Sequence, residues 1–160
     1  METLTAYHES GHALMASLLG GRVQSVTIEP DDDDGPRRHG DTRILWPLPR
    51  KRRTHARHEI LVLLAGPVAE MIYRGEPLHP GFVPQWADDW QRAWTLAEQI
   101  HSAHVRRLRQ LEQLTAQLHR SMSDDRCWAA LAALADELLA HETLDEEMVT
   151  DVLSVWLELP

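Results

Sequence analysis

The chain has 160 residues, of which 43% are hydrophobic and 26% are charged, and its formal net charge is -9. This length and composition are typical of one globular domain, which we expect to span residues 1–160. The acidic balance argues against a nucleic-acid partner, because phosphate binding needs a basic face. The single cysteine, Cys127, excludes an internal disulfide, and its apolar neighbours predict a buried, inert thiol. With no long apolar run and no secretory leader, we expect a cytoplasmic protein that does not insert into membranes.

The first predicted helix covers residues 2–19 and ends at Gly20-Gly21, a strong C-terminal signal. It contains the pattern H-E-x-x-H at residues 8–12. Histidines four positions apart project from one helical face, so His8 and His12 can grip a single metal ion. Glu9 points beside that ion, where a base can take a proton from a water on the metal. The apolar flanks favour a buried metal site over a surface helix with two unrelated histidines.

Residues 23–28 and 42–46 are predicted as strands, with a loop between them that carries four adjacent aspartates at positions 31–34. We interpret this acidic run as a solvated turn, because neighbouring carboxylates on a loop are not preorganised for a cation. A basic cluster follows, which we interpret as a solvated face or a subunit contact: Arg50, Lys51, Arg52, Arg53 and Arg57. The next helix is expected over residues 54–74. Its apolar centre belongs in the core, and Gly66-Pro67 implies a kink or a close helix contact.

The second half of the chain is expected to hold three more helices, over about 88–119, 123–140 and 143–156. A proline-rich loop at residues 75–86 precedes them. Each helix begins at polar residues suited to capping it: Asp88 with Gln91, Ser123, and Thr143 with Glu146.

Three tryptophans at a spacing of four, Trp86, Trp90 and Trp94, are expected to pack against the core rather than to line a substrate groove. Taken together, the elements predict a mainly α fold with a small two-stranded β element, and with H-E-x-x-H on the first helix.

A catalytic zinc site normally has three protein ligands and one open position, so the two histidines need a partner. The candidates are acidic or histidine side chains farther along the chain: Glu70, Asp88, Asp89, His79, His101 and His104. Glu70 stands at the end of an apolar helix. The two aspartates directly follow a loop, which can hold a carboxylate rigidly. Composition and spacing leave the choice open.

Five stretches of this chain share a pattern with one known family. They read A-Y-H-E-S-G-H-A-L at residues 6–14, S-V-T-I-E-P at 25–30 and L-L-A-G-P-V-A-E at 63–70. Residues 87–97 read A-D-D-W-Q-R-A-W-T-L-A, and residues 135–148 contain L-L and E-T-L. In the same order, they resemble the peptidase domain of the FtsH family of zinc metallopeptidases. The family motifs are A-Y-H-E-A-G-H-A-L, K-V-T-I-x-P, L-L-x-G-R-x-A-E, S-N-D-L-x-x-A-T-x-x-A and L-L-E-x-E-T-L.

This resemblance implies a role for each motif residue. Asp89 occupies the motif position of the family's third zinc ligand, which completes a Zn2+ site with His8 and His12. Glu9 stands at the general base. Glu70 falls on the family's helical glutamate, which implies a carboxylate that orients a ligand histidine from behind. Asp88, the residue before the third ligand, becomes the helix N-cap.

The chain also departs from the family pattern. The family joins this domain to a membrane anchor and an ATP-driven unfolding domain, but these residues contain no G-x-x-x-x-G-K-[ST] phosphate loop and no membrane segment. Pro67 replaces an arginine. Residues 97–119 run without a glycine or proline, so the family's insertion after the aspartate-bearing helix looks deleted.

We therefore expect an ATP-independent zinc metalloendopeptidase that cleaves unfolded polypeptides, peptides or exposed termini. The resemblance implies that substrate adds as a strand along residues 23–28. It also implies a homo-oligomer or an association with a full-length FtsH-type protease. The alternative is a catalytically silent metal-binding module or regulator, although such a site needs no base at Glu9. Soluble H-E-x-x-H peptidases that cleave repressors are a third hypothesis, but those carry the third ligand closer in sequence.

Overall fold

Helices make up most of the structure, which confirms the predicted mainly α class. The computed structural model describes residues 2–30 and 40–160. The acidic run at positions 31–34 therefore lies outside the described residues. Within them, every helix is too short or too polar to span a bilayer. The helices are α1 (Glu2–Leu18), α2 (Arg52–Arg74), α3 (Ala87–Ala97), α4 (His104–Met122), α5 (Asp125–His141) and α6 (Glu146–Ser154). The strands are β1 (Arg22–Thr27), β2 (Asp41–Leu45) and β3 (Thr143–Asp145), and two short 3-10 turns are η1 (Pro80–Phe82) and η2 (Pro84–Trp86).

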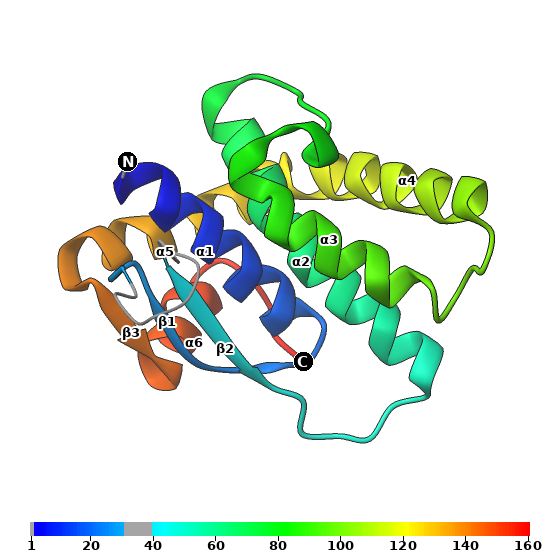
Figure 1. Ribbon diagram of the computed structural model, residues 1–160. Helices are drawn as coiled ribbons and strands as arrows, with labels where there is room; N and C mark the ends of the chain where they lie inside the picture. Colours follow the sequence, from blue (N-terminus) through cyan, green and yellow to red (C-terminus); the bar gives the residue numbers. More distant parts are fainter. Residues whose placement is uncertain (1, 31–39) are drawn as a thin grey trace.

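The centre of the molecule is the pair α1 and α2, which make the most extensive contact between any two elements. Figure 1 shows them side by side, with the sheet and α6 on one flank and α3 and α4 on the other. Two glycines let the helices approach. A Cβ on Gly11 would lie 2.4 Å from the carbonyl oxygen of Ala65, and one on Gly66 would lie 2.5 Å from the ring of His12. The close helix contact predicted at Gly66 is therefore confirmed.

Both central helices end where the sequence indicates. Gly20, just beyond α1, has φ 86°, a conformation that side chains disfavour. Gly75 has φ 72° and follows the last residue of α2, where its N–H donates to the carbonyl of Ile72. These left-handed glycines stop both helices and send the chain into loops.

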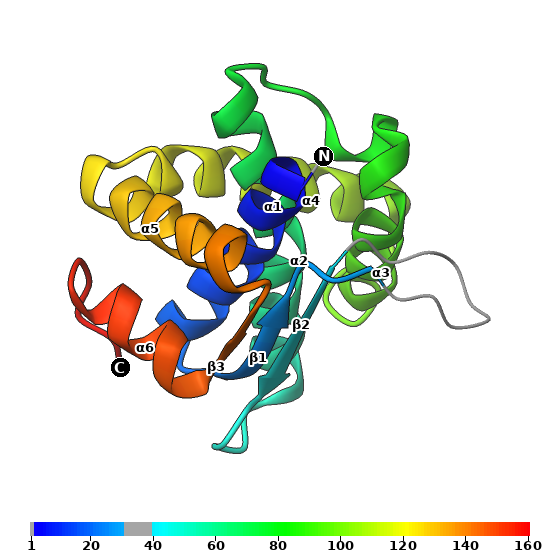
Figure 2. The same cartoon turned by 90° about the vertical axis from the view of Figure 1, so that its left-hand side faces the viewer.

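The sheet has three antiparallel strands in the order β2-β1-β3, not the two strands that we expected (Figure 2). Val26 of β1 pairs with Thr42 on one side and with Leu144 on the other. Leu144 is fully buried, so the three residues of β3 anchor this segment to the core. As a result β1 is the central strand, and the expectation that residues 23–28 form an open edge is wrong.

The long helix expected over residues 88–119 is also wrong, because α3 ends at Ala97 and α4 begins at His104. Arg107 explains the break. Its buried guanidinium donates to the backbone carbonyls of His101 and Ser102, at 3.3 and 3.0 Å, and lies 4.8 Å above the ring of Trp94. A buried cation needs such acceptors, and carbonyls that point at it cannot continue a helical ladder.

Helix caps in the second half lie one or two residues from the predicted positions. The residue before α3 is Trp86, so Asp88 stands in the first turn rather than at the cap. Asp124, not Ser123, caps α5 by accepting from the N–H of Cys127. Asp145, not Thr143, caps α6 by accepting from the N–H of Met148. A carboxylate suits the positive end of a helix dipole, which favours these neighbours as caps.

Other predicted surfaces and core positions are as expected. The thiol of Cys127 is buried, and burial raises its pKa above the ordinary range. Trp86 is buried, while Trp90 and Trp94 are partly buried against the core. The basic cluster is mostly exposed, in agreement with a solvated face: Lys51, Arg52, Arg53 and Arg57.

Candidate metal centre

Three side chains from two helices converge on one point. His8 and His12 come from α1, and Asp89 comes from the first turn of α3. Their ligand atoms all lie within 4.8 Å of one another. Asp89 Oδ2 is 2.7 Å from His8 Nε2 and 3.4 Å from His12 Nε2. We call these three residues the metal cluster. The structure thus brings together the set that the resemblance implies, and no other such group is found among residues 2–30 and 40–160.

Each histidine ring is held from behind by a second hydrogen bond. His8 Nδ1 donates to Glu70 Oε1 at 2.8 Å, and His12 Nδ1 donates to the carbonyl oxygen of Val62 at 2.7 Å. A carbonyl can only accept, which fixes the proton of a neutral His12 on Nδ1. The Nε2 lone pair then faces Asp89. This arrangement is the one that metal-binding histidines use, with the outer nitrogen tied to an oxygen and the inner nitrogen free to ligate.

Glu70 lies outside the metal cluster, on the far side of His8. Its other carboxylate oxygen is 3.8 Å from Nη2 of Arg74, one helical turn later. The side chain of Glu70 is 10% exposed, so its carboxylate is largely shielded from solvent. This position suits a residue that orients His8 rather than one that contacts a metal.

Glu9 is buried next to the cluster, with 6% of its surface exposed. The hydroxyl of Thr42, on β2, donates to Glu9 Oε2 at 2.6 Å. Gly40 lies against the same side chain, since a Cβ there would be 2.7 Å from Glu9 Cγ. The start of β2 therefore crosses directly over this carboxylate and fixes its orientation.

The acidic and basic groups of the metal cluster shift one another's pKa values. Burial lowers the pKa of His8, but hydrogen bonds to Asp89 and Glu70 outweigh it and raise that pKa to about 10. Burial also opposes ionisation of Asp89, yet the nearby His12 and His8 bring its pKa well below the ordinary range. Without a metal, the inner nitrogen of His8 shares a proton with the carboxylate. Metal binding has to displace such a proton, because histidine ligates in its neutral form.

The donor set fits zinc. Two imidazole nitrogens and one carboxylate oxygen are ligands that zinc accepts, and three protein ligands leave one position open. Helix α2 leaves no room for a side chain at Gly66, because a Cβ there would lie 2.6 Å from His12 Nε2 and 2.8 Å from His8 Nε2. Glycine is thus required where α2 passes both inner nitrogens.

The other candidate ligands point elsewhere. Asp88 is exposed. His79 accepts from the N–H of Gly81 and stacks on Phe82. His104 lies at the exposed start of α4 against Trp94. None of these belongs to the metal cluster.

Sequence reasoning missed two residues that shape this site. The carbonyl of Val62 carries no side-chain signal, and the hydroxyl of Thr42 lies 33 positions from the glutamate that it contacts. For Gly66, a close helix contact was predicted but not its place beside the two ligand histidines.

Comparison with known proteins finds no matching family model. Two partial matches are both named ATP-dependent zinc metalloprotease FtsH. The protein from Methylibium petroleiphilum is 37% identical over 106 residues, which is 61% of this chain and 15% of that protein. The protein from a Synechococcus species is 37% identical over 81 residues, 46% of this chain and 12% of that protein. This chain thus spans a small fraction of these relatives, and it is similar to one part of FtsH.

Proposed function

We propose that this chain is a zinc-dependent metalloendopeptidase that hydrolyses peptide bonds of unfolded polypeptides without a motor of its own. The observation that carries the proposal is a buried carboxylate, Glu9, held beside three converging ligand atoms. A site that only binds metal needs no such group. The printed names of the two relatives support protease chemistry and zinc.

A zinc ion bound by the metal cluster would polarise both a water molecule and the scissile carbonyl. Glu9 accepts a proton from the attacking water and then donates it to the leaving amine. Its hydrogen bond from Thr42 engages one carboxylate oxygen and leaves the other to accept the proton. Glu70 keeps His8 in the tautomer that ligates through Nε2.

The open edge of β2 is the surface that we propose for substrate. Among the described residues β2 pairs only with β1, which leaves its second edge without a strand partner. An extended peptide can add there by backbone hydrogen bonds. Thr42 lies on this strand and touches Glu9, so a peptide on β2 runs past the base. Only an unfolded segment can offer a free strand.

The experiment compares zinc content and casein cleavage in wild type and Glu9→Gln, with Glu59→Gln, a partly exposed helical position, as matched control. We expect about one zinc per chain in all three proteins. Cleavage should fall at least ~100-fold in Glu9→Gln, the usual effect of removing a general base, and stay unchanged in Glu59→Gln.

Two results would contradict the proposal in different ways. Zinc content near zero in gently purified wild type would remove the metal site. Full zinc content with no cleavage of casein or of a peptide library by wild type would favour the metal-binding module or regulator instead.

A further inference from the structure

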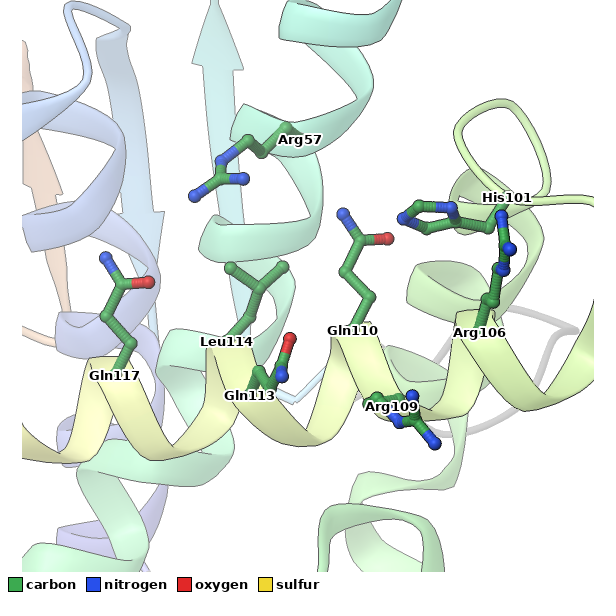
Figure 3. Close-up of a pocket in the computed structure, with 8 residues that line it drawn as sticks. All are labelled: Arg57, His101, Arg106, Arg109, Gln110, Gln113, Leu114 and Gln117. Atoms are coloured by element: carbon green, nitrogen blue, oxygen red, sulfur yellow. The ribbon is translucent and has the colours of Figure 1, made fainter.

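A second, separate feature is a polar groove between α2 and α4. It encloses about 350 Å³, at the lower end of the range for ligand sites. Figure 3 shows side chains from one face of α4, together with Arg57 of α2 and His101 from the segment before α4. Its lining residues are Arg57, His101, Arg106, Arg109, Gln110, Gln113, Leu114 and Gln117. We call it the α2–α4 groove.

Three arginines in this groove carry unbalanced charge. Arg57, Arg106 and Arg109 are exposed, and none forms an ion pair with any residue in the described part of the chain. The whole chain has 25 acidic and 16 basic side chains, so acidic partners are plentiful elsewhere. Gathering three unpaired guanidinium groups in one concavity costs repulsion, which an anionic ligand would relieve. Guanidinium forks match both carboxylates and phosphates.

The groove also holds an acceptor that lacks a donor. The side-chain oxygen of Gln110 is buried and has no hydrogen-bond partner among the described residues. Figure 3 shows this side chain between Arg57 and His101. A buried polar atom without a partner is costly, so this oxygen indicates a missing N–H or O–H donor. Free phosphate keeps few O–H groups at neutral pH, whereas an extended peptide presents a backbone N–H at every residue except proline.

Further amides continue along the same face of α4. Gln113 and Gln117 follow Gln110 at spacings of three and four, which keeps them on one side of the helix. From Gln110 to Gln117 the helix rises roughly 10 Å. That is about the length of three extended residues of a bound chain. Amide side chains can both donate to and accept from a peptide backbone.

We infer that the α2–α4 groove binds an acidic stretch of polypeptide. Its carboxylates pair with Arg57, Arg106 and Arg109, and one backbone N–H donates to Gln110. A single-stranded nucleic acid fits less well, because no tryptophan, tyrosine or phenylalanine among the described residues lines the groove for its bases to stack on. This binding does not rest on the proposed peptidase activity, since no residue of the metal cluster takes part.

The test is fluorescence anisotropy with a labelled nine-residue peptide rich in glutamate, against the same peptide with glutamine in place of each glutamate. We expect the glutamate peptide to bind at least tenfold more tightly. Single variants Arg57→Gln, Arg106→Gln and Arg109→Gln should each weaken it by roughly tenfold, the loss expected for one charge-assisted hydrogen bond. Arg120→Gln, an exposed arginine of α4 outside the groove, is the matched control and should stay within twofold.

Gln110→Met tests the acceptor, because it keeps the side-chain length but removes the oxygen. It should weaken the glutamate peptide without changing the binding of inorganic phosphate. Because Arg57, Arg106 and Arg109 are exposed, thermal melts of the three arginine variants should overlay that of wild type. Gln110→Met removes a buried oxygen without a partner among the described residues, so its melting temperature should equal or exceed that of wild type.

Equal binding of the glutamate and glutamine peptides would overturn the inference, and so would equal losses of affinity in Arg120→Gln and in the groove variants. Tighter binding of a single-stranded oligonucleotide than of the glutamate peptide would assign the groove to nucleic acid. Self-association in sedimentation that the groove variants abolish would assign it to a contact between copies of this chain.

Discussion

Helix α2 supports the histidines of the metal cluster through Glu70 and the carbonyl of Val62, and it also borders the α2–α4 groove through Arg57. The two regions treat polar groups in opposite ways. In the metal cluster every ring nitrogen has an oxygen partner, and His12 is 8% exposed. In the groove the arginines are exposed and form no ion pair with any residue in 2–30 or 40–160. The first arrangement is preorganised for one small ion at one position. The second leaves several donors free, which suits a longer ligand that can adjust its own conformation. A single helix can therefore support a rigid metal site and also border a groove whose ligand can adjust its conformation.

The largest expected effect is the loss of zinc from Asp89→Ala. This change removes one of three ligands, so zinc content should fall from about one per chain to less than a tenth. Glu70→Ala should retain zinc with an affinity about 10–100-fold weaker, as for other residues that support a ligand histidine. Elemental analysis and competition with a chromophoric chelator measure both.

Asp88→Ala is the control for that pair, because Asp88 is the exposed neighbour. The reverse ranking of Asp89 and Glu70 would move the third ligand to α2. A loss of acidic-peptide binding in Asp89→Ala would show that the metal cluster and the α2–α4 groove are coupled, and that they are not two independent sites.

The second effect is steric. Gly66→Ala should destabilise the protein by about 1–3 kcal/mol through overpacking. Helix propensity alone predicts the opposite sign, a gain of roughly 1 kcal/mol. Urea unfolding decides between them. In the double variant with His12→Ala the penalty should shrink, because the ring that meets the new methyl group is gone. An additive double variant would show that the contact with His12 is not the cause.

A third effect concerns the orientation of the base, and it rests on the proposed activity. Thr42→Val removes the hydroxyl that donates to Glu9, so kcat should fall about tenfold, comparable to the loss of one hydrogen bond to a charged group. Zinc content should not change. Thr42→Ser keeps the hydroxyl and should restore most of kcat. A serine variant as slow as the valine variant would assign the effect to strand packing instead.

The smallest expected effect is a change in stability on removing the hydroxyl of Ser10. Ser10 Oγ in α1 is buried and has no hydrogen-bond partner among the described residues, as is the case for the oxygen of Gln110. Ser10→Ala should raise the free energy of unfolding by up to about 1 kcal/mol, because it removes an unsatisfied hydroxyl and adds a better helix former. It should leave peptide binding unchanged, unlike Gln110→Met. A destabilised Ser10→Ala would mean that the hydroxyl has a partner, such as a bound water.

Local sequence signals predict the central part of this fold well. The helix that carries His8 and His12, its stop at Gly20 and the apolar α2 all follow from spacing and composition within about twenty residues. The two predicted strands match β1 and β2 to within a residue or two. The candidate ligands were also visible, but spacing did not choose among them. The choice of Asp89 came from family resemblance, and the structure then placed it beside both histidines.

The failures depend on particular contacts that composition and periodicity do not encode. The break between α3 and α4 contains no glycine or proline, and it depends on a guanidinium that reaches back only a few residues, to the carbonyls of His101 and Ser102. β3 is only three residues long, too short for a period-two pattern, and its partner strand lies more than a hundred positions earlier. The contact of Thr42 with Glu9 likewise depends on how the sheet packs over α1. No local window contains the partners of β3 or of Thr42.

The place of β3 in the sheet has a consequence for the order of folding. Strand β1 follows the first helix, but one of its two neighbours consists of residues 143–145. Pairing over such a separation closes a very large loop, which is slow compared with helix formation. During synthesis α1 and α2 can pack early, while β1 exposes a free edge until Leu144 emerges. In that interval the nascent chain is open to strand exchange with other unfolded chains.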